Sequence, residues 1–276
     1  MIKIDKSFDL EKTVFSGECF RMSKIEDAII LIIDDRVLKI KKVKDKYYIY
    51  SNNENNLKEK VYEYFDLVRD YERINDSIIK NDPSLKEIVK ASKGYKILKQ
   101  NNFEMFISYI ISQNNNVKRI SYSINKLSEM YGKKIIYENN EYYLFPTYAE
   151  LKNITMEDLK LCKVGFRDKY IINALNVIKE DNFFLTRLET LDTDNAYKEL
   201  MNIKGIGPKV ASCILMFGYG RFNAFPIDTW AKKFLMNKYN IHNIKELQKE
   251  LHTKYKENVG LVIQYMFNYE RNIKVN

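Results

Sequence analysis

The segment that most constrains the fold is Met201–Cys213, MNIKGIGPKVASC, in which one helical run ends, a Gly-x-Gly turn follows and another helix starts. The chain has only 9 glycines and 4 prolines, so Gly205, Gly207 and Pro208 mark a tight turn. Glycine ends a helix readily because it accepts a left-handed backbone, and proline suits the first turn of the next helix. The pattern predicts a helix-hairpin-helix.

This hairpin can also bind an anion. Glycine has no Cβ, so backbone N–H groups at Gly205 and Gly207 can point outward together towards a phosphate, helped by the dipole of the next helix. We therefore treat Lys204, Gly205 and Gly207 as candidates for binding a DNA phosphate. A capped turn without a ligand explains the same residues, and the local pattern leaves both interpretations open.

Lys209 follows in the first turn of the second helix, and Asp228 stands 19 positions later in FPIDTW. The helix dipole disfavours a cation there, so we expect a lowered pKa for Lys209 and some free amine for nucleophilic attack. Asp228 can cap the next helix. A surface lysine is the alternative for Lys209, and the nearby carboxylate favours a reactive pair.

The net charge is +9, and residues 196–276 carry 13 Lys/Arg against 6 Asp/Glu. The basic excess therefore coincides with the hairpin region. A solvated lysine surface and a binding surface for a polyanion both fit this charge.

Composition excludes several classes of site. The three cysteines form no CxxC pair, and the only histidines are His242 and His252. We therefore expect no disulfide framework, no metal site and no histidine-based triad. The sequence shows no signal peptide and no apolar run of the roughly 20 residues that a membrane span needs. We expect an intracellular, cytoplasmic protein with no membrane partner, associated with the nucleoid if it is prokaryotic.

The hydrophobic pattern predicts an α+β fold. β-Branched and aromatic runs at 29–33, 37–43 and 47–50 indicate an antiparallel meander, and 14–22 is predicted to be a loop that leads into the first strand. Asp82-Pro83 starts a helix, and nearly everything beyond it has helical periodicity. We predict an N-terminal α+β domain over residues 1–82 and a helical region over 83–276, with lobes at about 83–160 and 161–276.

The motif KGIGPKVA followed by FPIDTW resembles the helix-hairpin-helix and aspartate signature of the DNA glycosylases of base excision repair. Lys204 stands where that family usually has proline. The resemblance implies that the amine of Lys209 attacks C1′ of the damaged nucleotide, the base leaves, and a Schiff base permits strand cleavage by β-elimination. It also implies that Asp228 stabilises the positive charge that develops on the sugar.

Within that superfamily the chain is similar to the 8-oxoguanine DNA glycosylases over most of its length. The segment SQNNNVKRI matches their Asn-Asn-Asn segment, which implies that Asn114 and Arg119 face the cytosine left behind when its partner is flipped out. GFRDKY resembles their Gly-Tyr-Arg-x-Arg-Tyr loop, so Phe166 would fill the gap in the base stack and Arg167 would contact the cytosine. A core phenylalanine is the alternative for Phe166, and its replacement of tyrosine leaves the opposite-base preference open.

Two further segments imply a pocket for the damaged base. SGECFR resembles Ser-Gly-Gln-x-Phe-Arg, in which the carbonyl matching Gly17 accepts the N7 hydrogen that 8-oxoguanine has and guanine lacks. GLVIQYMF resembles Gly-x-Ala-Gln-x-x-Leu-Phe, so Phe267 would stack on the flipped base opposite Cys213. The family's glutamine falls at Ile263. The adjacent Gln264 would point about 100° away on an ideal helix, so either the helix is shifted or this contact is lost.

The sequence therefore predicts a bifunctional DNA glycosylase and abasic-site lyase that excises 8-oxoguanine from double-stranded DNA. We expect a monomer with no redox cofactor, and the resemblance is compatible with a monovalent cation at the hairpin carbonyls. A glycosylase for another lesion or opposite base, and a non-catalytic helix-hairpin-helix DNA-binding protein, are the alternatives.

Overall fold

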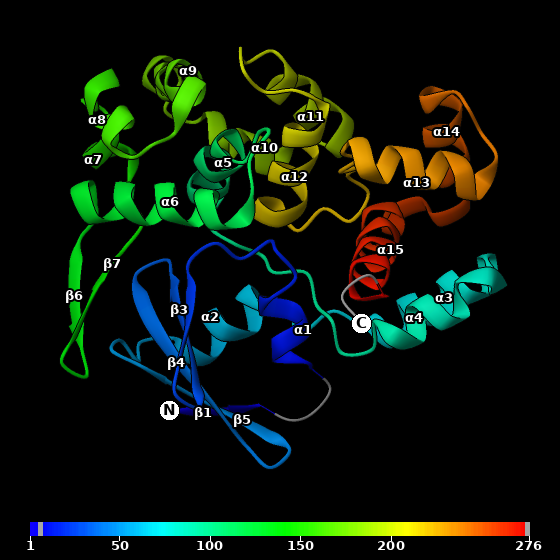
Figure 1. The fold of residues 1–276 in the computed structure, drawn as a ribbon, viewed down its shortest axis with the longest axis horizontal. Coiled ribbons are helices and arrows are strands. Elements are labelled where there is room, and N and C mark those ends of the chain that lie inside the picture. Colours follow the sequence, from blue (N-terminus) through cyan, green and yellow to red (C-terminus); the bar gives the residue numbers. More distant parts are fainter. Residues whose placement is uncertain (5–7, 274–276) are drawn as a thin grey trace.

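The structure, a computed structural model, describes residues 1–4 and 8–273 and consists of one antiparallel sheet and a larger helical region (Figure 1). The sheet has five strands in the order β1-β5-β4-β3-β2. The strands are β1 (Ile2–Ile4), β2 (Met22–Ile25), β3 (Ala28–Ile33), β4 (Arg36–Val43) and β5 (Lys46–Ser51). The predicted antiparallel meander and the α+β class are confirmed.

Strand β3 is apolar throughout, and it pairs in register with β4, in which apolar and lysine side chains alternate from Leu38 to Lys41. Leu31 of β3 pairs with Leu38 of β4, whereas the neighbouring Ile30 pairs with Lys39. One face packs on α1 (Leu10–Val14) and α2 (Leu57–Tyr64) in a separate hydrophobic cluster. The prediction for 14–22 is only partly right, because α1 ends at Val14 and a loop then leads into β2 at Met22.

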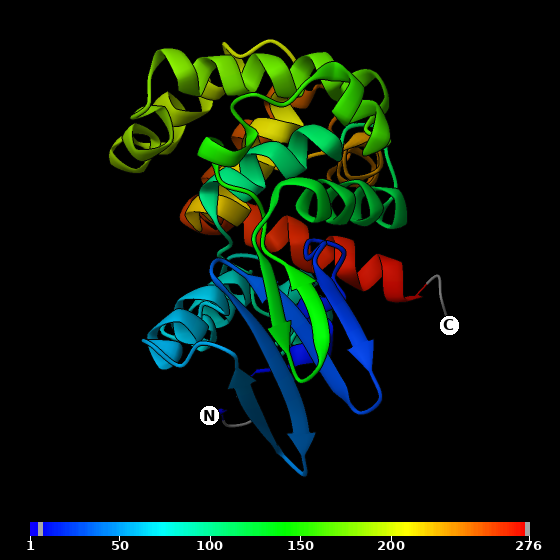
Figure 2. The same cartoon turned by 90° about the vertical axis from the view of Figure 1, so that its left-hand side faces the viewer.

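The remaining elements are helical apart from one hairpin. The hairpin consists of β6 (Lys134–Tyr137) and β7 (Asn140–Tyr143), and it lies beside the main sheet, where Lys39 pairs with Glu138 (Figure 2). The α-helices are α3 (Tyr71–Asn81), α4 (Lys86–Ala91), α5 (Asn102–Ile111), α6 (Val117–Tyr131), α7 (Tyr148–Leu151), α8 (Met156–Leu161), α9 (Asp168–Glu180), α10 (Phe184–Thr190), α11 (Thr193–Met201), α12 (Pro208–Tyr219), α13 (Thr229–Tyr239), α14 (Ile244–Tyr255) and α15 (Val259–Ile273). Three short 3-10 helices are η1 (Pro83–Leu85), η2 (Gly165–Arg167) and η3 (Lys256–Asn258).

Side-chain caps fix where several helices begin. Asp82 accepts a hydrogen bond from the backbone of Ser84 at the start of η1, with Pro83 in the first position. Thr147 and Thr155 form capping boxes at α7 and α8. Asp228 caps α13. Each cap satisfies backbone donors that would otherwise have no partner in the helix.

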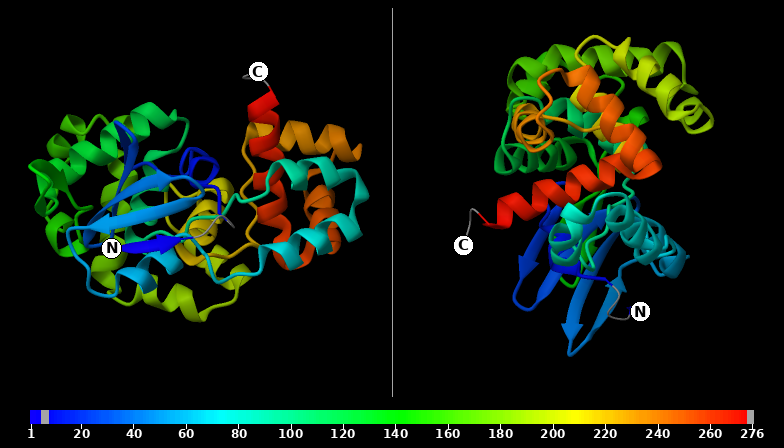
Figure 3. Two further views of the ribbon diagram at one scale, coloured as in Figure 1. Left: turned by 90° about the horizontal axis from the view of Figure 1, so that it is seen from below. Right: turned by 90° about the vertical axis from the view of Figure 1, so that its right-hand side faces the viewer.

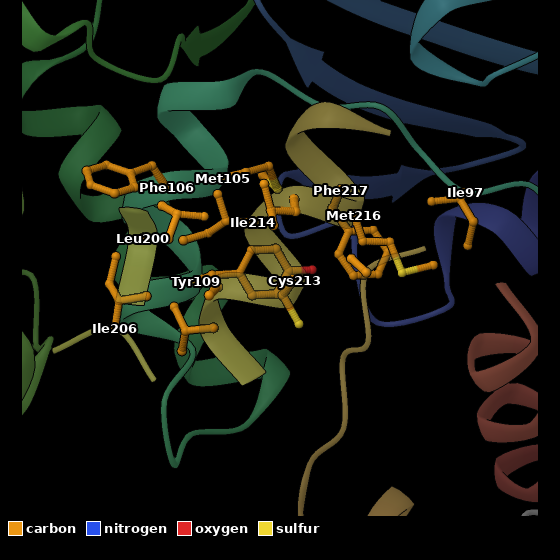
Figure 4. Close-up of a cluster of buried hydrophobic side chains, with 14 of the residues drawn as sticks. Ile97, Met105, Phe106, Tyr109, Leu200, Ile206, Cys213, Ile214, Met216 and Phe217 are labelled. Atoms are coloured by element: carbon orange, nitrogen blue, oxygen red, sulfur yellow. The ribbon is translucent and has the colours of Figure 1, made fainter. Parts of the chain in front are cut away.

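Helix α12 is the buried centre of the helical region. Its residues from Val210 to Gly218 are all buried, and it packs against α5, where the rings of Tyr109 and Phe217 stack with centroids 5.5 Å apart (Figure 4). A helix that is apolar on all sides requires neighbours on all sides. This position fixes the first turn of α12, and with it Lys209.

The helices do not group by halves of the chain. Helices α3 and α4 pack on α14 and α15, whereas α5 packs on α6, α9 and α12 (Figures 1 and 3). The bounds at residues 82 and 160 stay predictions about domains, and the packing crosses both of them. Among the described residues, no helix has the length and apolar character required to cross a bilayer.

Candidate active site

A cavity of about 370 Å³ lies where the loop before β2, the α5–α6 junction, the first turns of α12 and helix α15 meet. Its volume falls within the range of small-molecule sites, roughly 300 to 1,000 Å³. The structure brings together here every residue predicted for catalysis or for the damaged base: Gly17, Lys209, Cys213, Asp228, Ile263, Gln264 and Phe267.

Lys209 lies in the first turn of α12, with its Nζ 5.2 Å from the ring centroid of Tyr109. Burial by itself lowers the pKa of Lys209, but the acidic side chains around the amine, Cys213 first and then Glu18 and Asp228, outweigh burial and raise the pKa. The expectation of a lowered pKa is therefore wrong. The dipole argument considered only the helix itself and omitted carboxylates contributed by other segments.

Cys213 lies one turn further along α12, and its thiol is hydrogen-bonded to the amine of Lys209. Burial raises the pKa of Cys213 to about 12. The thiol is therefore neutral near pH 7 and contributes no charge there. Glu18 and Asp228 are the other two side chains that raise the pKa of Lys209.

Asp228 reaches the cavity from the start of α13. Its Oδ1 accepts a hydrogen bond of 2.7 Å from the backbone N–H of Ala231, which fixes the carboxylate at the helix N-terminus. The helix dipole stabilises a negative charge in that position. The side chain is therefore oriented by the fold as an anion that borders the same cavity as Lys209.

Gly17 has a positive φ of 99°, which side chains other than hydrogen rarely adopt. A Cβ at Gly17 would lie 2.9 Å from Nη1 of Arg271, which donates a 2.8 Å hydrogen bond to the carbonyl of Ser16. The backbone angle therefore requires glycine, whereas a Cβ would only displace the end of the flexible Arg271 side chain. Recognition of N7 by its carbonyl stays a prediction.

Ile263 and Gln264 both border the cavity from α15 and are 3% and 5% exposed. The Oε1 atom of Gln264 is buried, and no described residue donates a hydrogen bond to it. An unpaired buried acceptor costs free energy unless a ligand supplies a donor. Gln264 is therefore the residue of this turn of α15 that places a polar group at the cavity. Recognition of the base edge by Ile263 or Gln264 stays a prediction.

The residues predicted to face the opposite base lie near one another beside the Asn114 loop. Phe166 is 51% exposed, so the interpretation as a core phenylalanine is wrong. The guanidinium of Arg167 lies 4.5 Å from the Phe166 ring and donates to the carbonyls of Gln113, Asn114 and Val164. In this structure Arg167 holds the Asn114 loop, and Arg119 is close enough to lower the pKa of Arg167, though less than burial does. Their contacts with the opposite base stay predictions.

The hairpin at Lys204–Gly207 lies directly before the first turn of α12, which borders the cavity. Gly205 has a φ of 100°, and a Cβ there would lie 2.3 Å from the ring of Tyr170. Gly207, in contrast, has an ordinary φ of −101° and no atom within 4 Å of an added Cβ. The exposed Lys204 presents a carbonyl that accepts from Asn173. Packing against Tyr170 thus requires glycine at position 205, whereas the space beside Gly207 is open. Phosphate binding by the hairpin stays a prediction.

Sequence reasoning missed several cavity residues, among them Glu18, Tyr109 and Arg271. Glu18 replaces the glutamine of the Ser-Gly-Gln-x-Phe-Arg pattern, a departure that could have drawn attention to it. Tyr109 is one apolar position of an apolar helix, and Arg271 is 255 residues from its partner Ser16. No local pattern identifies those two. Among the described residues, no group of three or more His, Cys, Asp or Glu side chains could hold a metal ion.

Comparisons with known proteins agree with this architecture. A family profile described as the N-terminal domain of 8-oxoguanine DNA glycosylase matches residues 1–106. The crystal structure of Clostridium acetobutylicum 8-oxoguanine glycosylase/lyase, in complex with double-stranded DNA containing cytosine opposite 8-oxoG, superposes with a TM-score of 0.90 at 35% identity, covering 98% of this chain and 93% of that one.

Two curated relatives have similar names. A probable N-glycosylase/DNA lyase of Methanothermobacter thermautotrophicus is 29% identical over 78% of this chain and 75% of its own length. An N-glycosylase/DNA lyase of Saccharomyces cerevisiae is 32% identical over 74% of this chain and 57% of its own length. Together with the full-length structural match, these similarities show that the chain belongs to the 8-oxoguanine DNA glycosylase family.

Proposed function

We propose that this protein is a bifunctional DNA glycosylase and abasic-site lyase that excises 8-oxoguanine from duplex DNA in base excision repair. The observation that carries this proposal is that Lys209 and Asp228, from two different helices, border one cavity together with Gly17 and Phe267. Relatives that match most of this chain are named as 8-oxoguanine glycosylase/lyase or N-glycosylase/DNA lyase. A DNA-binding module without catalysis would not require the lysine and the carboxylate in one cavity.

The reaction begins when the damaged nucleotide leaves the base stack, which costs a few kcal/mol that contacts with DNA offset. The free amine of Lys209 attacks C1′, and the bond from C1′ to the base breaks with its electron pair on the base. Asp228 stabilises the positive charge on the sugar. The amine then forms a Schiff base with the opened sugar, and β-elimination cleaves the strand.

We further propose how the base is recognised. The carbonyl of Gly17 accepts the N7 hydrogen of 8-oxoguanine, and Phe267 and Cys213 contact the two faces of the base. Gln264 supplies the amide to the base edge, because its Oε1 has no donor among the described residues and borders the cavity. One hydrogen bond made to 8-oxoguanine and lost with guanine is worth about 1 to 3 kcal/mol.

The DNA around the lesion is held by the residues outside the cavity. We propose that Gly205, Gly207 and Lys204 bind a phosphate, and that the exposed Phe166 fills the vacated stack. Asn114, Arg119 and Arg167 lie near it and face the opposite base. A monomer working in the cytoplasm, or at the nucleoid of a prokaryote, is part of the same proposal.

Borohydride trapping tests the nucleophile directly, because it reduces a Schiff base to a stable link between protein and DNA. On a duplex with 8-oxoguanine opposite cytosine we expect an adduct with the wild-type protein and none with Lys209→Gln. Lys179→Gln, which removes an exposed lysine on α9, is the matched control and should be trapped as wild type is. An adduct that persists in Lys209→Gln would overturn the assignment of the nucleophile.

A second candidate is a glycosylase of the same family for another lesion. It is favoured by Ile263, an apolar residue at the position where the family pattern has glutamine. Cleavage of 8-oxoguanine opposite each of the four bases, beside duplexes that contain other oxidised purines, distinguishes the two candidates. Preference for a different lesion by about tenfold or more would favour the second one.

A further inference from the structure

Glu18 is an ionisable side chain in the wall of the cavity with no role assigned so far. It borders the same cavity as Lys209 and stands where the family pattern has a neutral glutamine. The fold holds it in place from two sides. Its carbonyl accepts a hydrogen bond of 3.1 Å from Nε2 of Gln100, and its Oε2 accepts one of 2.6 Å from the hydroxyl of Tyr109. The carboxyl group is therefore built into the site.

The same tyrosine connects Glu18 to the amine. Nζ of Lys209 lies 5.2 Å from the centroid of the Tyr109 ring, whose hydroxyl binds Glu18, and the ring itself is stacked against Phe217 in the core. Figure 4 shows the Tyr109 ring and Cys213 next to each other among the labelled side chains of the buried cluster. Tyr109 thus contacts both groups, Lys209 through its ring and Glu18 through its hydroxyl. Burial raises the pKa of Glu18 above that of an ordinary carboxyl, which makes it a stronger base.

A protonated amine has no electron pair for attack, so the proton of Lys209 must move before the reaction can start. Among the described cavity residues Cys213 is a neutral thiol and has no charge to accept it with. Asp228 is exposed, and its Oδ1 already accepts the backbone N–H of Ala231 at the N-terminus of α13, whereas Glu18 lies in the cavity wall. Glu18 is the remaining carboxylate.

We propose that Glu18 accepts the proton of Lys209 once a flipped base has closed the cavity to water, a role that depends on the glycosylase function proposed above. One N–H bond of Lys209 breaks and one O–H bond forms on Glu18. The electron pair stays on Nζ and then forms the bond to C1′. Entry of the base removes water, and a neutral amine beside a neutral carboxyl is favoured over an ion pair in a dry site.

Lys209 and Glu18 titrate as a coupled pair, and side chains from several elements act on Glu18. Lys209 and Cys213 act on Glu18 from α12, Asp228 from the start of α13, Arg271 from α15, Tyr109 from α5 and Tyr95 from the segment before α5. The reactive pair carries one proton in total, on nitrogen or on oxygen. The rate is therefore level between the pKa of Glu18 and the higher pKa of Lys209.

The variant Glu18→Gln tests this, because it keeps the side-chain shape and an oxygen that can accept from Tyr109. We expect single-turnover excision at saturating protein to fall by about a hundredfold near pH 7. In this variant only the free amine reacts, so the logarithm of the rate should rise with pH with a slope of about one where wild type is level. Loss of fold alone would lower the rate without changing the shape of this profile. Glu26→Gln, an exposed glutamate between β2 and β3, is the matched control and should behave as wild type.

Two more variants keep the test decisive if Glu18→Gln does not fold. Glu18→Asp should restore the level region, at a lower rate. Tyr109→Phe should move its acidic edge to higher pH, because the hydroxyl that lowers the pKa of Glu18 is gone. A profile in Glu18→Gln that is parallel to wild type, or a faster reaction, overturns the role of Glu18 while leaving the proposed function intact. Absence of any wild-type adduct with 8-oxoguanine DNA overturns both.

Discussion

Gln264 shows a conflict between stability and binding at the scale of a single residue. Its Oε1 is buried without a donor from any described residue, in a side chain that is otherwise packed in α15. Leaving such an acceptor unpaired costs about 1 to 3 kcal/mol. A residue that weakens the free protein in this way is typical of a site prepared for a ligand.

Replacing Gln264 by leucine should therefore stabilise the protein and impair recognition. We expect the free energy of unfolding to rise by about 1 kcal/mol, because the unpaired acceptor is removed at nearly constant volume. Affinity for a duplex with 8-oxoguanine should fall by about tenfold relative to an undamaged duplex. Urea unfolding and competition binding measure the two effects. A variant that is less stable and binds as well as wild type would contradict this account.

At the scale of elements, the start of α13 combines a structural and an electrostatic role in one side chain. Asp228 caps the helix through the N–H of Ala231 and also contributes to the raised pKa of Lys209. Asparagine caps helices about as well as aspartate but has no charge. The two roles can therefore be separated by comparing two substitutions.

For Asp228→Asn we expect nearly unchanged thermal stability and a large loss of excision, about a hundredfold, because the sugar cation loses its counter-charge. For Asp228→Ala we expect a similar loss of excision together with about 1 kcal/mol less stability, because the cap is lost as well. Thermal unfolding and single-turnover kinetics on the same preparations provide the comparison. Equal stability of the two variants would mean that the cap contributes little.

The elements also show what the sequence can and cannot specify. Helix α6, from Val117 to Tyr131, has apolar positions that repeat with the helical period, so the sequence alone indicates it. Strand β1, with three residues, is too short to show a period. Gly132 ends α6 with a φ of −83°, and glycine is needed there because a Cβ would meet the carbonyl of Leu144, a contact that no local pattern shows.

In the candidate site, too, the sequence predicts what a local motif contains and misses what tertiary packing brings together. Lys209 and Asp228 were predicted because the motif that contains them is local, and the structure places them in one cavity. The direction of the Lys209 pKa was not predicted, because it depends on the burial and spacing of Cys213 beside the amine and on Glu18, which comes from a segment nearly two hundred residues away. Charges that meet through tertiary packing do not show in a local pattern.

At the scale of the whole molecule, the net charge of +9 should make DNA binding strongly dependent on salt. Each phosphate contact adds about 0.9 to the negative slope of log affinity against log salt concentration. If Lys204 contacts a phosphate at the hairpin, Lys204→Gln should reduce that slope by about 0.9. The exposed lysine of the control Lys179→Gln should leave it unchanged. Fluorescence anisotropy over a salt series measures both slopes, and an unchanged slope in Lys204→Gln would argue against the contact.

The hydrogen bond from Arg271 to Ser16 links segments 255 residues apart, and both flank the cavity. A chain emerging from the ribosome folds its N-terminal part first. The sheet and α5 can therefore form while α15 is still unmade, but the cavity remains open on one side until synthesis has passed Arg271. The nascent protein would therefore contain Lys209 for some time before it could hold a damaged base. The site would become active only after α15 has been synthesised and has packed against the cavity.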